Sequence, residues 1–251
     1  MDMETVFTIL KFMLVGFFAQ LIDGAIGMAY GVSSTTFLLS LGISPAAASA
    51  SVHIAKIFTT AVSALAHWKL RNIDTSLAKK LLLPGVLGGI TGAFLLVTID
   101  GNLIAPFVSA YLLIMGIIIL VKAFGPKQKR TEPKHVGSLG FIGGFFDSIG
   151  GGGWGPIVTT TLVARGNHPR VAIGTVNFTE FFVSFAQSVA FVISLSFFEY
   201  WQIILGLLLG GMIAAPLAAL ATRRIPLKVL MIMVGIVIVL LSLRTMWLTV
   251  F

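Results

Sequence analysis

The sequence lacks cysteine and has few charged residues. None of its 251 residues is cysteine, and only 10% are Asp, Glu, Lys or Arg, whereas a soluble chain carries about 25%. The absence of cysteine excludes disulfides, thiolate metal sites and cysteine nucleophiles. The shortage of charge excludes a chain whose whole surface faces water. With 57% hydrophobic residues and a mean hydropathy of +1.02, the composition indicates a polytopic membrane protein.

Motifs of soluble enzymes are absent or out of context. The sequence contains no P-loop, no HExxH zinc motif and no Gly-x-Ser-x-Gly nucleophile elbow. The spacing Gly150-x-Gly152-x-x-Gly155 matches a dinucleotide fingerprint, but no βαβ unit and no downstream acidic residue accompany it. We therefore expect a protein that is not an enzyme and that uses no cofactor and no metal.

Apolar stretches of helical length fill the chain. A membrane helix needs about 20 apolar residues, and lipid requires internal backbone hydrogen bonds, so every stretch is predicted to be helical. The predicted segments are 6–22, 25–41, 46–67, 80–98, 103–122, 137–149, 153–164, 170–196, 201–221 and 227–249. The segments 137–149 and 153–164 are too short to span, and the glycines between them predict a re-entrant hairpin.

The two halves of the chain resemble each other. A shift of 124 positions gives 14 identities over residues 16–66, where about four are expected by chance, which is typical of a duplicated architecture. We predict a first repeat at 1–123, a basic linker at 124–136 and a second repeat at 137–251. Each repeat would hold about five helical segments and begin with a glycine-rich hairpin. An odd number of crossings makes the repeats inverted, as in secondary transporters.

The basic residues cluster in four regions of the chain. The regions near 68–80, 122–134, 165–170 and 223–228 hold 14 of the 17 Lys and Arg residues. The positive-inside rule then places these regions in the cytoplasm and both termini outside. The formal charge of +8 is thereby explained without a nucleic acid partner.

One pattern of aspartate and glycine occurs twice. It reads Asp-x-x-x-Gly-x-x-x-Gly, and its members are Asp23, Gly27, Gly31, Asp147, Gly151 and Gly155. Each aspartate is expected at the start of a second half-helix, where it can cap backbone N–H groups while the glycines allow close helix contact. The same geometry would serve a broken helix that aims backbone donors at a substrate anion. Both interpretations stay open.

Charged groups also lie in the middle of the third segment of each half. His53, Lys56 and Thr60 share one helix face, and the matching positions are Asn177, Glu180 and Ser184. Lys56 and Glu180 would form an ion pair that joins the halves, or Lys56 and His53 would attract an anion while Glu180 takes part in proton coupling. His53 could equally be structural. Further polar candidates for lining a substrate site are Gln20, Ser34, Thr35, Thr159 and Thr160.

The motifs together resemble a known family. The stretch Gly16–Gly31, the Gly42-x-x-Pro45 turn, the run Ala48–His53 and the second-half stretch Gly140–Asn177 are similar to the TauE/SafE sulfite-exporter family. The resemblance implies an inner-membrane carrier of small sulfur-containing or organic anions, such as sulfite or sulfonates including sulfoacetate. It also implies export driven by an ion gradient. Family motif positions carry over only for the paired glycine motifs and for His53 and Asn177.

The leading hypothesis is a secondary transporter that moves a small anion by alternating access. Its expected partners are the anionic substrate, the lipid bilayer and a coupling proton or cation. A passive anion channel, a membrane scaffold or insertase subunit, and a cation carrier that uses Asp23, Asp147 and Glu180 are the alternatives. A homodimer is also left open by the small-xxx-small pair Gly88 and Gly92.

Overall fold

The computed structural model describes residues 2–26, 29–124, 135–165, 167–195, 200–224 and 227–250. These residues contain helices and no strand. The elements are α1 (Met3–Ile26), α2 (Tyr30–Ser40), α3 (Pro45–Lys69), α4 (Thr75–Thr98), α5 (Gly101–Phe124), α6 (Val136–Gly150), the π-helical turn η1 (Gly155–Thr159), α7 (Thr160–Ala164), α8 (Pro169–Ser194), α9 (Trp201–Arg224) and α10 (Leu227–Val250). Gly27 and most of the predicted linker, 125–134, lie outside the described residues.

The predicted helical segments are confirmed by these elements. Within the described part of the chain, six helices are long and apolar enough to cross a membrane: Met3–Leu21, Pro45–Lys69, Thr75–Thr98, Gly101–Phe124, Val171–Ser194 and Met231–Leu248. Val136–Gly150 and Trp201–Ala214 are shorter apolar helices. At 1.5 Å per residue, the 11-residue α2 is also too short to span a bilayer core of about 30 Å.

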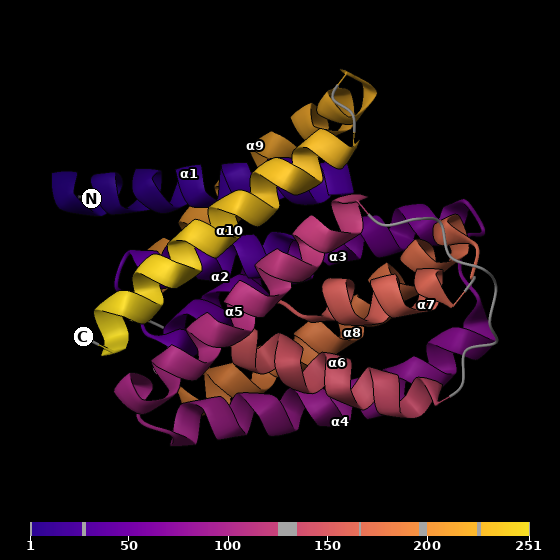
Figure 1. Cartoon of the computed structure of the whole chain (residues 1–251), viewed down its shortest axis with the longest axis horizontal. Helices are drawn as coiled ribbons and strands as arrows, with labels where there is room; N and C mark the ends of the chain where they lie inside the picture. The colour runs from indigo at the N-terminus through magenta and orange to yellow at the C-terminus, as the bar shows by residue number, and fades with distance from the viewer. Residues whose placement is uncertain are drawn as a thin grey trace.

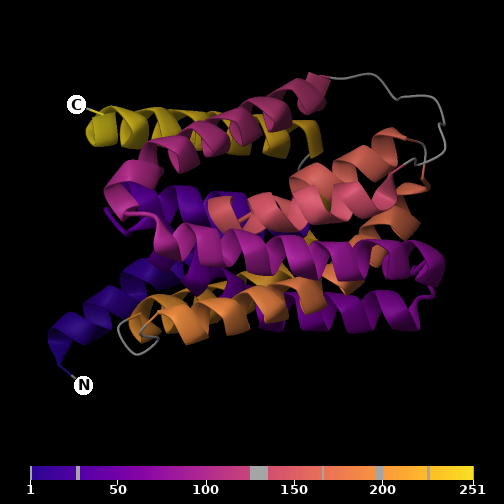
Figure 2. The same ribbon diagram turned by 90° about the horizontal axis from the view of Figure 1, so that it is seen from below.

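The helices run roughly along the long axis of the molecule (Figures 1 and 2). Both termini lie at one end, whereas the α3–α4 connection and the end of α5 lie at the other. We call these the terminal end and the basic end, because His67 and Lys69 close α3 and Lys122 closes α5. Orientation in the membrane stays a prediction.

Helices of one half pack on helices of the other. α1 packs along α9, α4 along α6, α3 along α8 and α5 along α10. Glycines allow two of these contacts, because a side chain on Gly144 would overlap the carbonyl of Gly85 and one on Gly210 would overlap the carbonyl of Met13. The core is therefore built between the halves and not inside each of them.

The small residues of α4 are used inside the chain. Gly88 lies against the carbonyl of Phe141, and Gly92 lies against the carbonyl of Phe145 and the side chain of Ser148. Gly88 and Gly92 are thus covered by α6 and do not themselves offer a contact surface to a second copy of the chain, while a homodimer stays a prediction.

Helical structure is interrupted at matching places in the two halves, between α1 and α2 and between α6 and η1. We call these interruptions the first and second breaks. In the first half α1 continues to Ile26 and α2 begins at Tyr30, so the break lies later than the predicted end at residue 22. In the second half α6 runs through Gly150, and Gly151 reverses the chain with a φ of +64°. This left-handed conformation carries little cost only for glycine. The re-entrant character of the two breaks stays a prediction.

Candidate functional site

Two aspartates cap the helices that follow the breaks. Asp23 Oδ1 accepts hydrogen bonds from the N–H groups of Ala29 and Tyr30 at 2.8 and 2.9 Å. Asp147 Oδ1 accepts from Gly153 and Trp154 at 2.7 and 2.9 Å. The predicted capping is confirmed, but the predicted position is wrong. Each aspartate belongs to the end of the preceding helix and reaches across the break, because a carboxylate there meets the free N–H groups of the next helix.

A buried cluster of four charged groups lies beside the second break. Lys56 Nζ is 2.5 Å from Glu180 Oε1 and 3.5 Å from Asp147 Oδ1. His53 Nε2 is 3.1 Å from Asp147 Oδ2, and His53 Nδ1 is 2.8 Å from the carbonyl oxygen of Ser49. The predicted ion pair between Lys56 and Glu180 is therefore present. It belongs to a larger group that joins α3, α6 and α8.

The His53 ring is held from two sides. One ring nitrogen faces the Asp147 carboxylate on α6 and the other faces the backbone carbonyl of Ser49 in its own helix. Lys56 faces both Asp147 and Glu180. Burial requires such pairing, since an unpaired charge in low dielectric is costly.

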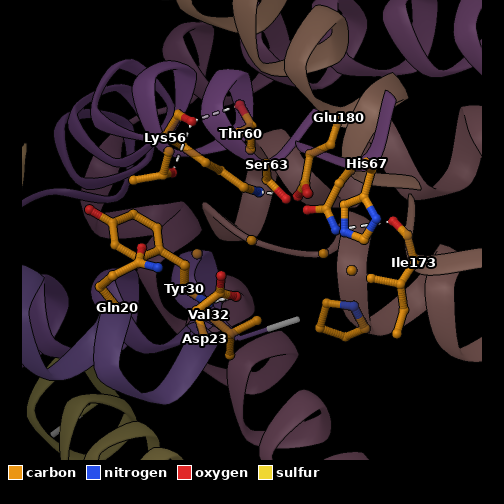
Figure 3. A pocket seen from close by; sticks show the side chains of 17 residues that line it. Gln20, Asp23, Tyr30, Val32, Lys56, Thr60, Ser63, His67, Ile173 and Glu180 are labelled. Atoms are coloured by element: carbon orange, nitrogen blue, oxygen red, sulfur yellow. Dashed lines mark hydrogen bonds and ion pairs between the residues drawn. The ribbon is translucent and has the colours of Figure 1, made fainter. Parts of the chain in front are cut away.

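A cavity of about 290 Å³ lies next to this cluster. It follows α3 from Lys56, in the middle of the helix, to His67 in the last turn at the basic end. Figure 3 shows Gln20, Asp23 and Tyr30 along one side and Lys56, Thr60 and Ser63 along another, with Glu180 and His67 nearby. Beyond Lys56, toward the terminal end, His53 and Val52 are buried. The cavity thus extends from Lys56 toward the basic end and not toward the terminal end, and in this sense we call it one-sided.

The predicted substrate residues divide between the cavity wall and the surrounding core. Gln20, Lys56 and Asn177 line the cavity. Those that do not are His53, Ser34, Thr35, Thr159 and Thr160. Thr160 Oγ1 donates to the carbonyl of Pro156 in the preceding turn η1, which is the common behaviour of a helical threonine.

The acidic and glycine positions also divide. Asp23 and Glu180 line the cavity, while Asp147 lies buried behind its wall. Gly31 and Gly155 line it as well, whereas Gly151 packs against the side chain of Thr35.

Sequence reasoning missed several wall residues. Tyr30, Thr59, Ser63 and His67 line the cavity without having been predicted to bind. Three of them follow Lys56 at helical spacing on α3, so the polar face that begins at Lys56 could have been extended to residue 67. Tyr30 carries no such signal, because its place depends on the break before α2.

Comparison with known proteins agrees with this architecture. Residues 12–245 match the family described as "Sulfite exporter TauE/SafE". The chain is 40% identical over 247 residues to the "Probable membrane transporter protein YtnM" of Bacillus subtilis (strain 168), with 95% of this chain and 82% of the relative covered. No solved structure is significantly similar to it. The chain therefore belongs to the TauE/SafE sulfite exporter family and is a multi-pass membrane transporter.

Proposed function

We propose that the protein is a secondary transporter that exports a small sulfur-containing or organic anion, such as sulfite or a sulfoacetate-like sulfonate, across the inner membrane. The observation that carries this proposal is the ammonium group of Lys56 in the wall of a one-sided cavity at mid-helix. A cavity of about 290 Å³ suits a small solute. An ionisable group at this depth is costly and is typical of a transport site.

Matched contacts in the two halves support inverted repeats and alternating access. The bonds from Asp23 to Tyr30 and from Asp147 to Trp154 span the same number of residues. A second pair of contacts is related by the 124-residue shift. Gly210 contacts Phe17 and Gly88 contacts Phe141, where Phe141 is the shifted equivalent of Phe17 and Gly210 lies two residues before the shifted equivalent of Gly88. Each of the two glycine contacts joins one half to the other, as expected if the halves are exchanged by a two-fold axis in the membrane plane.

The charge balance suggests how an anion enters. Lys56 already faces Glu180 at 2.5 Å and Asp147 at 3.5 Å. An incoming anion must take the place of one carboxylate, because a further negative charge in the cluster would be unbalanced. Glu180 is the candidate for displacement, since it lies in the cavity wall while Asp147 is held by two backbone N–H groups and His53. A proton taken up by Glu180 would then move together with the substrate, and export would proceed when the outward driving force on the anion exceeds the inward driving force on the proton.

The first test removes the cation. Lys56→Ala should abolish sulfite uptake by proteoliposomes, because the anion loses its counter-charge. Lys11→Ala, which removes an exposed lysine of α1 that does not line the cavity, should transport normally. A cooperative thermal transition of the purified variant shows that Lys56→Ala is folded. Unchanged uptake by a folded Lys56→Ala protein would refute the site.

The second test separates binding from coupling. Glu180→Gln removes the exchangeable proton but leaves Asp147 opposite Lys56. We expect sulfite still to raise the melting temperature of this variant, since a ligand that binds the folded state stabilises it. Uptake against a concentration gradient, driven by an imposed pH difference, should be lost. A variant that still concentrates sulfite would show that Glu180 carries no coupling proton.

A cation carrier is the second candidate, and one observation favours it. Asp23 and Glu180 both line the cavity, and Asp147 lies directly behind it. Three carboxylates beside a single lysine would also suit a cationic substrate. Competition decides between the two: sulfite and not a metal ion should protect the purified protein against unfolding.

A passive anion channel is a separate alternative. Uptake of sulfite against a concentration gradient would exclude it, because a channel cannot concentrate its solute.

A further inference from the structure

The cavity has a counterpart in the second half that is closed. A shift of 124 positions, forward from the wall residues Thr60 and Ser63 and backward from Ile173 and Asn177, gives a second set on the same two helices. That set is Ser184, Gln187, Ser49 and His53. Ser63 is partly exposed in the cavity, whereas Gln187 is fully buried. The two matching sets of polar residues thus differ in accessibility: the first lines a cavity and the second is buried.

The closed counterpart contains polar atoms that lack partners. Among the described residues, Ser184 Oγ and Gln187 Oε1 are buried and make no hydrogen bond. Both side chains have a relative exposure of 0%. A buried polar atom without a partner is destabilising, so a polar residue at such a position indicates that its polar atom is needed in another state. Contact with water or substrate in another state would meet that need.

Local contacts show that the two sets are built alike. Asn177 Nδ2 donates to the carbonyl of Ile173 at 3.0 Å, and His53 Nδ1 lies 2.8 Å from the carbonyl of Ser49. Both contacts run four residues back along their helix, and the second is the shifted equivalent of the first. The difference between the sets therefore lies in what covers them.

Residues of the second break supply part of the cover. Trp154, the shifted equivalent of the wall residue Tyr30, is fully buried and donates its indole N–H to the carbonyl of Val176 at 3.2 Å. Gln187 Nε2 donates to the carbonyl of Gly144 at 3.2 Å. These contacts seal the face of α8 against α6 and the second break. Breaking them would uncover Ser184 and Gln187.

We propose that the transporter has a second state in which a cavity lined by Ser49, His53, Ser184 and Gln187 opens toward the terminal end and receives the same small anion. This inference rests on the proposed alternating-access function. Lys56 and Glu180 map onto each other under the shift, so both cavities share this pair and the substrate site stays at the centre. The existing cavity closes as the second one opens.

Because the chain contains no cysteine, single cysteines can be introduced and labelled without first removing native ones. Single cysteines at Ser184→Cys and Gln187→Cys are exposed to a membrane-impermeant thiol reagent in vesicles supplied with sulfite. We expect modification from the terminal end, at least about tenfold faster than at Val176→Cys, because a core position opens only by local unfolding. Thr60→Cys and Ser63→Cys should instead react from the basic end.

Controls define the faces and the outcomes. Leu70→Cys marks the basic end and Met3→Cys the terminal end, since both side chains are exposed. Each variant is assayed for sulfite flux in proteoliposomes. Variants that transport sulfite while Ser184→Cys and Gln187→Cys stay unmodified from the terminal end would overturn the second cavity and leave the proposed function intact. Absence of flux in the unmodified protein would refute the proposed function itself.

Discussion

A single carboxylate, that of Asp147, holds together three parts of the molecule. It accepts two backbone N–H groups at the start of the next helical segment and also contacts His53 and Lys56 on α3. Its equivalent, Asp23, makes the two backbone contacts and lies in the cavity wall. The two equivalent aspartates thus differ in their contacts: Asp147 joins the break to α3, whereas the described contacts of Asp23 are with the start of the next helix.

This difference predicts unequal effects of one substitution. Asp147→Asn should lower the free energy of unfolding by about 3–5 kcal/mol, since it removes the buried negative charge that faces Lys56 and His53. Asp23→Asn should cost about 1 kcal/mol or less, because asparagine is also a good helix cap. Thermal unfolding of both variants in detergent measures the two effects. Equal losses would contradict the assigned role of Asp147.

The sequence allowed part of this site to be predicted, and the rest required the fold. The positions of His53 and Lys56 on one helix face follow from their spacing, and so does the capping potential of the aspartates. The contact between His53 and Asp147 joins residues 94 positions apart. No local pattern encodes such a contact, because it depends on how α3 packs against α6.

At the scale of elements, glycines set the distance between helices. α6 contains Gly144, where a side chain would overlap the carbonyl of Gly85, and Gly137, where the nearest atom to an added Cβ is Pro84 Cγ at 3.7 Å. Close backbone approach of this kind is typical of helix pairs in membranes. The α4–α6 contact therefore depends on particular glycines of α6 and not on its glycine content.

Two alanine substitutions on the same helix test this dependence. Gly144→Ala should lower the free energy of unfolding by about 1–3 kcal/mol, because α6 must move away from α4 to make room. Gly137→Ala should be neutral or stabilising, since alanine favours a helix by up to about 1 kcal/mol over glycine. Melting temperatures of the two variants give the comparison. A loss at Gly137 as large as at Gly144 would show that helix spacing is not the cause.

Helix positions could be predicted from the sequence, whereas the breaks were less certain. Long apolar runs such as 80–98 and 103–122 fall inside α4 and α5, because membrane thickness fixes their length. The end of α1 was placed too early, at residue 22. Asp23 and Gly24 look like a break in sequence, but the Asp23 carboxylate bonds forward to Ala29 and lets α1 continue to Ile26.

For the whole molecule, basic residues mark one end. The α3–α4 connection and the end of α5 lie opposite both termini (Figure 2), and Lys69 and Lys122 belong to the last turns of α3 and α5. The structure thus brings to one end two of the basic residues that the sequence analysis assigns to one side of the membrane, and the side itself stays a prediction.

This arrangement predicts an absolute orientation that labelling of intact cells can test. Because loops rich in Lys and Arg stay in the cytoplasm, Leu70→Cys should be protected from a membrane-impermeant thiol reagent until the cells are permeabilised. Met3→Cys should react at once, since the terminal end faces outward. Both side chains are exposed, at 68% and 72%, so burial cannot explain a difference. Reaction of Leu70→Cys in sealed cells, with Met3→Cys protected, would show that the orientation is opposite to the predicted one and that the existing cavity faces outward.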